Sequence, residues 1–554
     1  MQASAGLGIA TRKQPAAGSH GAVAAAHPLA VAAGIEMLAR GGNAIDAAVS
    51  MAVTLTVVEP FMSSLFGAGC TVARLAGGEI LCLDHYSVAP AAAHATMYDP
   101  LPPAKGLFNA RDDANNIGYL AVGVPGNVAC YQELMRRAGT LPWEVVFGPA
   151  IRAAEEGYRV TPLQRAMIAQ GERHLRRFRA SAEVFLPGGQ VPEVGAVIRR
   201  PDYAETLREV ARTQGEAFYR GSIADAVAAD MKANGGLITR EDLASYRLRV
   251  REPIRGEYRG RQLVAMAPTS SGGVGLVQLL NILEGYDLGA LGFGTEQSVH
   301  LIAEAMKIVF ADRDAVLGDP DLMSLPIELL TSKEYAEECR GRIDLERARE
   351  YPSGMVSGDS QHTTHLSAID SQGNMVAITQ TLNGLFGSYV TVPGTGMLLN
   401  NNMRLFDPRP GRPNSVGPGK RMLSSMCPAL LFDRDGSALA IGVPGGTRIF
   451  NAVAQAIMNL VDHGMTLQEA VEAPRMHTGT VGDGLLLERG HPVDDGALKR
   501  RGHRIERVGK VAGGMHAVMA SAGGKRLEGV SCWRSDGAAA AWSGGSAADE
   551  SFIF

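Results

Sequence analysis

Two adjacent threonines, Thr363 and Thr364, could carry chemistry in this chain of 554 residues. They begin the segment TTHLSAID, which the turn SQGN joins to the segment MVAITQTLN, and this alternation predicts a β-hairpin over residues 363–383. A threonine hydroxyl within a chain has no base beside it. Cleavage of the bond between His362 and Thr363 would give Thr363 a free α-amine, which could accept the proton of its own hydroxyl. Without cleavage, the two threonines simply begin an edge strand.

Thr381 and Asn383 lie on the second arm of the predicted hairpin. They are two residues apart, so in a strand they share one face and could point at Thr363 across the hairpin. The ordinary preference of threonine for strands would also explain Thr381.

Two further motifs offer hydrogen-bond donors. Gly445 and Gly446, in GVPGGTRI, lie between a predicted strand and a predicted helix, where backbone N–H groups could converge on an oxyanion. A plain turn that needs glycine for a positive φ is the alternative. Ser424 and Ser425, in KRMLSSMCP, could donate hydrogen bonds to a carboxylate, or they form only a polar loop.

The elements that would position these residues follow from hydrophobic periodicity. The segment HPLAVAAGIEMLARGGNAIDAAVSMAVTLTVVEP predicts two helices broken at Gly41 and Gly42, with Asn43 as the N-cap of the second. Two strands follow, then a mostly helical middle with apolar residues at i, i+3 and i+4. After Thr363 the pattern changes to strands, including GTGMLLNNNM and PALLFDRDGSALAIGVPGG, and then to the helix GTRIFNAVAQAIMNLVDHG. This order predicts an α/β fold with αββα layers.

The stretch before Thr363 has a different character. Residues 348–362, AREYPSGMVSGDSQH, are polar and turn-forming and show no periodicity. They predict an exposed linker that leads directly to Thr363, a location suited to chain breakage.

Composition excludes several functional classes. A net charge of −4 and a pI near 6.4 argue against a nucleic-acid or anionic-membrane partner.

The six cysteines form no CxxC pair and have no histidine spacing typical of zinc, so we expect reduced thiols and no metal site. No signal peptide is evident and no stretch approaches the roughly 18 apolar residues of a membrane span. A cytoplasmic location is therefore expected.

Taken together, these segments resemble the γ-glutamyltransferase family of N-terminal-nucleophile (Ntn) hydrolases. The resemblance includes HPLAVAAGIEMLARGGNAIDAAV, TTHLSAIDSQGNMVAITQTLNGLFGS, LLNNNM, VGPGKRMLSSM and GVPGGTRI, in the expected order. It implies a proenzyme that cleaves itself into a large subunit, residues 1–362, and a small subunit, residues 363–554. The two fragments would stay together as a heterodimer, one four-layer αββα Ntn unit, with a higher oligomer also possible. No metal or organic cofactor is implied.

The resemblance also implies roles for individual residues. Thr363 would be the nucleophile both for self-cleavage after His362 and for substrate turnover. Thr381 would position the Thr363 hydroxyl, and Asn383 would help to bind the acyl group. The remaining roles are oxyanion N–H donors and ligands of a substrate carboxylate, carried by Gly445 and Gly446 and by Ser424 and Ser425 respectively.

Two positions depart from the family pattern. The family motif D-F-R-E-x-A-P corresponds here to DHYSVAP, which puts Tyr86 where an arginine would pair with the glutamyl α-carboxylate. The family aspartate that pairs with the α-ammonium, after NNxM, is replaced by Leu405, with Arg404 before it. A buried ammonium without an acceptor costs several kcal/mol. A simple acid could still bind through the two serines and Arg404, so a γ-glutamyl group is not expected.

We therefore expect an Ntn amide hydrolase acting on a small-molecule amide whose acyl group carries a carboxylate. Glutaryl-type substrates, as for cephalosporin acylases, and oxamate-type substrates both fit. The short span between Phe406 and Arg421 suggests an open site that favours hydrolysis over transfer. One alternative is a true γ-glutamyltransferase or glutathione hydrolase. Another is an unprocessed homologue without activity.

Overall fold

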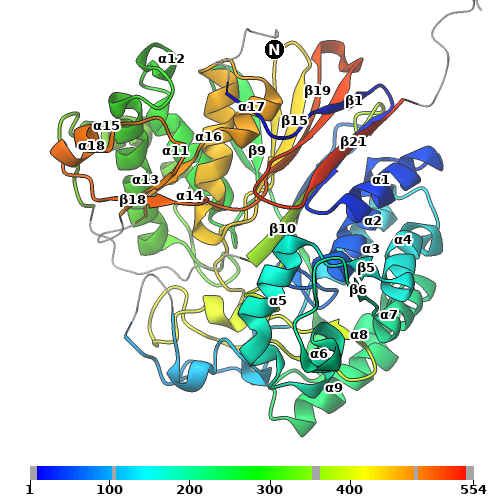
Figure 1. The fold of residues 1–554 in the computed structure, drawn as a ribbon. Coiled ribbons are helices and arrows are strands. Elements are labelled where there is room, and N and C mark those ends of the chain that lie inside the picture. Colours follow the sequence, from blue (N-terminus) through cyan, green and yellow to red (C-terminus); the bar gives the residue numbers. More distant parts are fainter. Residues whose placement is uncertain (1–8, 103–107, 352–361, 480–483, 544–554) are drawn as a thin grey trace, which may run out of the picture.

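Two antiparallel sheets of seven strands form the centre of the molecule. The computed structural model describes residues 9–102, 108–351, 362–479 and 484–543 (Figure 1). The strands of the first sheet are, in hydrogen-bonded order, β1 (Ala16–Gly18), β20 (Leu527–Ser531), β19 (His516–Ala520), β15 (Ala438–Gly442), β14 (Ala429–Phe432), β9 (Arg261–Ala265) and β8 (Ile254–Tyr258). Those of the second are β21 (Ala538–Trp542), β2 (Gly21–Ala25), β10 (His362–Asp370), β11 (Met375–Asn383), β3 (Ala68–Arg74), β4 (Ile80–His85) and β7 (Arg249–Val250).

The hairpin predicted over residues 363–383 is confirmed as β10 and β11. It lies in the middle of the second sheet, with β2 beside β10 and β3 beside β11. Thr364 pairs with Gln380, but the register shifts between His362 and Thr364. Such a bulge re-aims a side chain at the end of a strand, and here it falls on Thr363.

Helices cover the outer face of the second sheet. The helices α1 (Pro28–Ala39) and α2 (Ala44–Val58) pack against β2, β10 and β11. The predicted break and cap are confirmed, because the Asn43 side chain accepts hydrogen bonds from the N–H groups of Ile45 and Asp46. Every residue of α2 is buried, since α4 (Trp143–Glu156) packs over it as well.

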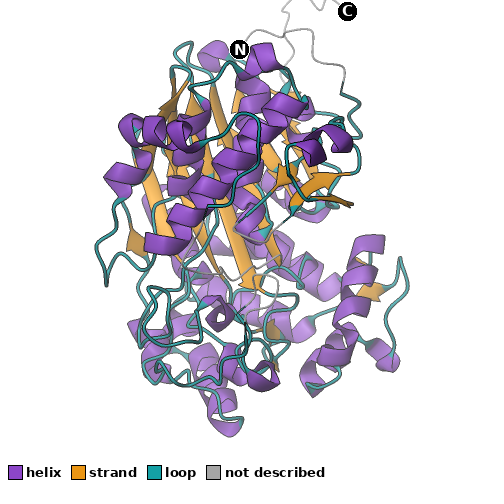
Figure 2. Ribbon diagram, turned by 90° about the vertical axis from the view of Figure 1, so that its left-hand side faces the viewer, coloured by secondary structure: helices purple, strands orange, loops and turns teal. Residues whose placement is uncertain are grey.

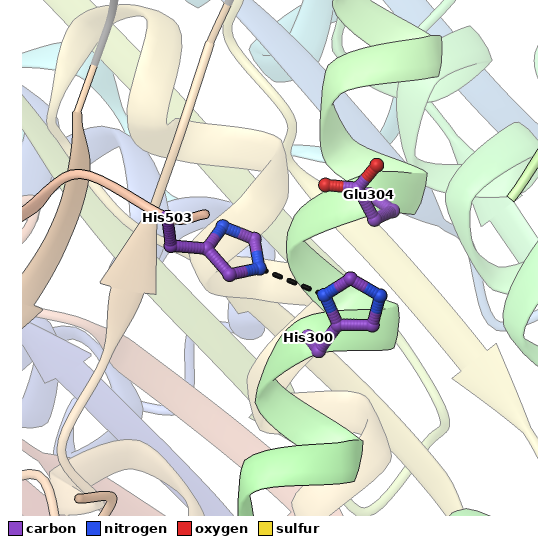
Figure 3. Close-up of side chains that lie close together, drawn as sticks. All are labelled: His300, Glu304 and His503. Atoms are coloured by element: carbon purple, nitrogen blue, oxygen red, sulfur yellow. Dashed lines mark hydrogen bonds between the residues drawn. The ribbon is translucent and has the colours of Figure 1, made fainter. Parts of the chain in front are cut away.

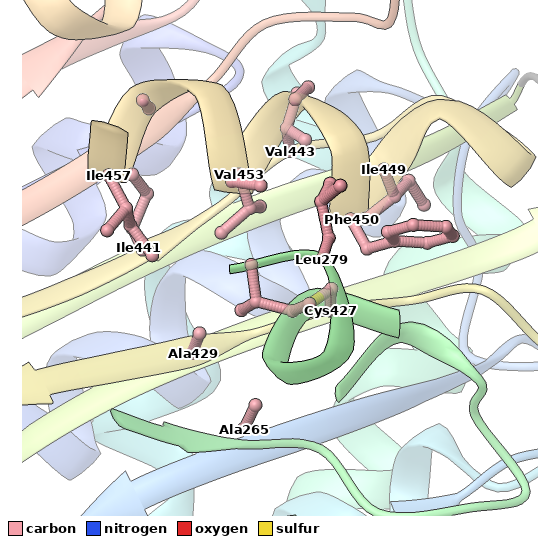
Figure 4. Packing of buried hydrophobic residues seen from close by; sticks show 14 of the residues in the cluster. Ala265, Leu279, Cys427, Ala429, Ile441, Val443, Ile449, Phe450, Val453 and Ile457 are labelled. Carbon is pink, nitrogen blue, oxygen red and sulfur yellow. The ribbon is translucent and has the colours of Figure 1, made fainter. Parts of the chain in front are cut away.

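Other helices cover the first sheet. The helices α11 (Gly272–Leu283) and α13 (Glu296–Val316) pack together, and α16 (Ile449–Val461) packs on α11 (Figure 1). Phe450, Val453 and Ile457 of α16 face the sheet with Leu279 of α11 (Figure 4). Small residues on the strands, such as Ala429, let these helices approach closely.

The two sheets also pack against each other. Strand β10 contacts β15 and β19, and β11 contacts β15. Figure 2 shows the strands behind the helices that cover the first sheet. The mixed helix-and-sheet fold expected from the sequence is confirmed, and it places the start of β10 in the interior.

The remaining elements surround this centre. Helices with bounds not yet given are α3 (Asn127–Ala138), α5 (Pro162–Leu175), α6 (Arg179–Phe185), α7 (Pro201–Arg212), α8 (Glu216–Arg220), α9 (Ser222–Ala233), α10 (Arg240–Ser245), α12 (Leu288–Leu291), α14 (Ile327–Thr331), α15 (Lys333–Arg342), α17 (Leu467–Glu472) and α18 (Asp495–Arg500). The short strands are β5 (Tyr158–Arg159), β6 (Val197–Ile198), β12 (Thr391–Val392), β13 (Met397–Leu398), β16 (Met476–His477), β17 (Leu485–Glu488) and β18 (Ile505–Val508).

The strand expected at GTGMLLNNNM is shorter than the sequence suggests. Only Met397 and Leu398 pair, as β13. The asparagines that follow use their side chains to bind backbone groups elsewhere; Asn400, for example, donates to the carbonyls of Phe66 and Gly123. Side-chain hydrogen bonds of this kind compete with strand pairing.

Three other expectations concern the cysteines, membrane-spanning segments and the linker before Thr363. All six cysteines are buried and none forms a disulfide. None of the described helices is both long and apolar enough to cross a membrane. The predicted linker at residues 348–362 lies largely outside the described residues.

Candidate active site

Thr363 is buried and its hydroxyl contacts Thr381. The Thr363 side chain is only 3% exposed, and its Oγ1 donates to Oγ1 of Thr381 at 3.4 Å. The Thr381 hydroxyl in turn donates to the carbonyl oxygen of His362. It also accepts a hydrogen bond from the backbone N–H of Asn383, at 2.7 Å. One hydroxyl thus contacts both the predicted nucleophile and the carbonyl of the bond that would be cut.

The end of β11 fixes Thr381 in this position. Asn383 has a φ of +78°, in the left-handed region, and ends the strand there. Its side-chain N–H group donates to the carbonyl of Asn401 at 3.0 Å, and the N–H of Gly384 donates to the Asn401 side chain at 2.7 Å. Asn383 lines neither cavity at Thr363, so its role in acyl binding stays a prediction.

Two cavities meet at Thr363. The smaller, of 20 Å³, is lined by Tyr86, Thr363, Leu405, Leu423, Ser424, Ser425, Met426, Gly446, Thr447 and Ile449. The larger, of 220 Å³, is lined by Ala26, Glu59, Met62, Leu163, Met167, Gln170, His362, Thr363, Pro444, Gly445, Arg448, Lys510, Ala512, Gly513, Gly514, Arg534 and Ser535. The glycine pair predicted from the sequence therefore lies between them, with Gly446 on the smaller cavity and Gly445 on the larger.

The glycine pair occupies a turn that only glycine suits. Gly445 has a φ of +149° and Gly446 a φ of +62°. A Cβ atom on Gly445 would lie 2.7 Å from the Cβ of Ala512. The alternative given in the sequence analysis, a turn that needs glycine for its positive φ, is therefore also true. It does not conflict with an oxyanion role, which needs close approach of the backbone.

Arg313 contacts Ser425, one of the two serines, and was missed by the sequence analysis. Its Nη2 donates to Oγ of Ser425 at 3.0 Å and its Nε to Oγ of Ser271 at 2.9 Å. It also forms a buried ion pair with Asp314. Because the guanidinium donates to Ser425, the hydroxyl proton of Ser425 remains available to a substrate anion. Arg313 lies on a predicted helix, and helical periodicity does not distinguish it from a surface arginine.

Tyr86 and Leu405 line the smaller cavity, as their alignment with the missing arginine and aspartate would require. Tyr86 is 2% exposed, and its backbone N–H donates to Asp84 at 3.1 Å. Burial raises the pKa of the Tyr86 phenol, while a hydrogen bond with Ser424 acts against that shift. The phenol is therefore neutral at physiological pH and can only act as a hydrogen-bonding group.

Arg404 does not line either cavity at Thr363. Burial raises the pKa of the Tyr389 phenol to about 12, and the Arg404 charge acts against that shift, so Arg404 lies near Tyr389. Its predicted part in substrate binding stays a prediction.

Glu59 is a second residue that the sequence analysis missed. It lines the larger cavity with His362 and Thr363. The hydroxyl of Thr364 donates to its Oε2 at 2.6 Å. Burial raises the pKa of this carboxyl to about 7, against the lowering effect of the Thr364 hydrogen bond. A glutamate at the end of an apolar helix gives no sequence signal of this contact, because Thr364 is remote in the chain.

One group among the described residues could present ligands to a metal: His300, Glu304 and His503, whose ligand atoms lie within 4.8 Å of one another (Figure 3). His300 Nε2 faces the carbonyl of Asp344 at 2.7 Å and must donate to it, so Nδ1 accepts from His503 Nε2 at 2.8 Å. Glu304 accepts from Lys307 at 2.6 Å. The three side chains thus already have hydrogen-bond partners within the protein, and none lines either cavity at Thr363.

Relatives of this chain are found along nearly its whole length. The family described as Gamma-glutamyltranspeptidase matches residues 30–542. The Acylase ACY 1 proenzyme of Pseudomonas sp. (strain SE83) is 46% identical over 537 residues, which cover 96% of this chain and 95% of the relative. The Glutathione hydrolase proenzyme of Escherichia coli (strain K12) is 37% identical over 495 residues, covering 87% and 84%. The crystal structure of cephalosporin acylase from Bacillus halodurans has a TM-score of 0.87 and 33% identity, covering 98% of this chain and 100% of that chain.

Proposed function

The chain belongs to the gamma-glutamyltranspeptidase family and is a hydrolase, and from this premise we propose that it cuts itself before Thr363 and then hydrolyses amides of a carboxylate-bearing acyl group. The observation that carries the proposal is the Thr381 hydroxyl, bound both to the Thr363 hydroxyl and to the His362 carbonyl. The helix and sheet layers would be the αββα arrangement of an Ntn hydrolase.

Self-cleavage begins with the Thr363 hydroxyl. Its oxygen attacks the carbonyl carbon of His362, a C–O bond forms, and the C–N bond to Thr363 breaks. The hydroxyl proton passes to the nitrogen, which becomes the α-amine of Thr363. The Thr381 hydroxyl, which donates to this carbonyl oxygen, stabilises the negative charge that develops there. Water then hydrolyses the ester, leaving fragments 1–362 and 363–554 as a heterodimer.

Substrate turnover would use the same oxygen. The new α-amine accepts the Thr363 hydroxyl proton as the oxygen attacks the substrate amide. Backbone N–H groups of Gly445 and Gly446 stabilise the oxyanion. The amine leaves with a proton from the α-ammonium, and water, which gives up its proton to the α-amine, releases the acid.

The smaller cavity decides which acyl group fits. The side chains of Tyr86 and Leu405 bring no formal charge to it, so an α-ammonium would lack a carboxylate partner. The hydroxyls of Ser424 and Ser425, with Arg313 behind Ser425, suit a carboxylate. Glutaryl-type and oxamate-type groups both meet this requirement. The relative named as an acylase has the higher identity, 46% against 37% for the glutathione hydrolase, which supports this choice.

Two measurements test the proposal. Mass spectrometry of the purified protein should find a fragment that begins at Thr363, whereas Thr363→Ala should stay intact. The processed protein should hydrolyse glutaryl or oxamyl anilides faster than a γ-glutamyl anilide. Preferred turnover of the γ-glutamyl anilide would establish the glutathione-hydrolase alternative, and a chain that stays uncut would establish the unprocessed one.

A further inference from the structure

A further cavity, separate from the two at Thr363, has no part in the proposed reaction. Its volume is 310 Å³, and none of its lining residues lines either cavity at Thr363. One face of α3, the end of α8 and residues 246–248, which follow α10, form its lining. Small-molecule sites have volumes of about 300–1,000 Å³, so this cavity is large enough to hold a ligand.

Two arginines of this lining are held together without a carboxylate between them. Nη2 of Arg220 donates to the carbonyl oxygen of Ala244 at 3.0 Å, and Nη1 of Arg247 donates to the same oxygen at 2.9 Å. Two cations that share one neutral acceptor repel each other. An oxyanion bound between the two guanidinium groups would relieve this repulsion and accept charge-assisted hydrogen bonds from both.

The charges of Arg220 and Arg247 remain available to a ligand. Among the described residues, the Arg247 guanidinium donates to the carbonyl oxygens of Ala244 and Tyr246, and neither of these carries a negative charge. Arg220 pairs with Glu216 at 3.2 Å, but both side chains of this pair are exposed. An exposed pair of this kind contributes at most about 1 kcal/mol, so a ligand can compete for Arg220.

The one acid of the lining is already occupied. Glu133 accepts hydrogen bonds from Nε and Nη2 of Arg136 at 2.9 and 2.7 Å. It also accepts one from Arg137 at 2.8 Å. Glu133 is therefore shared between two other arginines, and the lining, which holds three arginines and this glutamate, is positive.

Two stacked tyrosines give the cavity an aromatic surface. The ring centroids of Tyr219 and Tyr246 lie 5.8 Å apart, with an angle of 4° between the ring planes. Both side chains are buried, and their hydroxyls donate to the backbone carbonyls of Pro125 at 3.2 Å and Tyr86 at 2.9 Å respectively. The rings are thus fixed before a ligand arrives, which lowers the entropic cost of binding.

We propose that this cavity is a second binding site, for a small molecule that carries a carboxylate or a phosphate on an apolar body. The oxyanion binds between Arg220 and Arg247, and the body lies against the tyrosine rings. All residues of the lining precede Thr363. The inference therefore depends neither on self-cleavage nor on the acyl group of the substrate.

Isothermal titration of the uncut variant Thr363→Ala with phenyl phosphate, benzoate and phenol tests the proposal. Both anions should bind with a dissociation constant below about 1 mM, and phenol, which lacks the oxyanion, at least about 10-fold more weakly. The anion that binds more tightly identifies the group for which the site is built. The parent protein should give the same constants, whether it is cut or not.

Variants of the two arginines locate the site. Arg220→Gln and Arg247→Gln should each weaken binding of the tighter anion at least about 10-fold, because each removes one of its two cations. The matched control is Arg504→Gln, which removes an exposed charge that lines none of the three cavities, and it should bind like the parent. Since Arg220 and Arg247 are exposed, their variants should fold, and an unchanged thermal midpoint checks this.

The result that supports the site is saturable binding that the control retains and both arginine variants lose. Absence of saturable binding for both anions overturns it. Binding that neither variant weakens also overturns it, because the anion would then lie elsewhere, as at Ser424 and Ser425.

Discussion

The Thr381 hydroxyl has three hydrogen-bond partners at the junction before Thr363, so substitution of Thr381 tests the proposed self-cleavage directly. Thr381→Ala removes a donor to the His362 carbonyl and should slow self-cleavage about 100-fold or more, the usual cost of losing one oxyanion donor. Thr381→Ser keeps the hydroxyl and should cleave at a similar rate. Denaturing gels taken over time give both rates; equally fast cleavage of the alanine and serine variants would remove Thr381 from the mechanism.

Glu59 should make the stability of the uncut protein depend on pH. Its pKa of about 7 in the folded state lies above the ordinary value of 4.5. The folded state therefore binds more protons than the unfolded state between those values. The free energy of unfolding should fall as pH rises from 4.5 to 7, by about 3 kcal/mol.

The measurement uses two uncut proteins, Thr363→Ala and Thr363→Ala/Glu59→Gln. Urea denaturation from pH 4.5 to 8 should show the fall only in the protein that retains Glu59. Parallel curves for the two proteins would mean that Glu59 is ionised at neutral pH.

At the scale of elements, the turn between β15 and α16 combines a strained backbone with a tight contact. A Cβ on Gly445 would meet Ala512 at 2.7 Å, so Gly445→Ala must move the backbone that presents the proposed oxyanion donor. We expect kcat to fall about 100-fold.

The matched control for this turn is Gly436→Ala, between β14 and β15. Gly436 has a φ of +83°, but a Cβ there would lie 3.8 Å from its nearest neighbour. It should cost about 1 kcal/mol of stability through backbone strain, with kcat unchanged. Similar losses of kcat in both variants would show that the Gly445 effect is only one of folding.

Elements with local signals were predictable from the sequence. The hairpin of β10 and β11 follows from alternation and a turn motif, and the start of α2 follows from Asn43 and its capping box. The bulge at Thr363 was not predicted, because strand register depends on the neighbouring strands.

The contacts that complete the site join residues far apart in the chain. Arg313 and Ser425 are separated by 112 positions, and Glu59 and Thr364 by 305. No periodicity within a segment carries such information. Thr363, Thr381 and the glycine pair could be identified from the sequence. Arg313 and Glu59 could be identified only once the fold was known.

At the scale of the whole molecule, the pair of His300 and His503 joins the two sides of the Thr363 junction. Burial lowers the pKa of His503 to about 3, with Lys307, His300 and Arg501 acting in the same direction. The unfolded state thus binds more protons between about pH 6.5 and 3, so stability should fall as pH drops below 6.5.

The variant His503→Gln tests whether His503 causes this loss of stability in acid. It removes the titrating ring, so its thermal midpoint should decrease less than that of the parent protein between pH 7 and 5. Thr363→Ala should be the background for both proteins, so that no cleavage intervenes. An identical decrease in both proteins would assign the acid sensitivity to other groups.

Both central sheets take strands from either side of the junction: β1, β8 and β9 meet β14, β15, β19 and β20 in one, and β2, β3, β4 and β7 meet β10, β11 and β21 in the other. In the uncut chain these strands share one molecule, with an effective concentration on the order of millimolar. The proposed cleavage would remove the tether, so that the unfolded halves would have to find each other by diffusion. Refolding of the cut protein would then slow with dilution, while that of the uncut protein would not. Maturation would therefore turn reversible folding into one-way assembly, and the lifetime of the enzyme would depend on how slowly it unfolds.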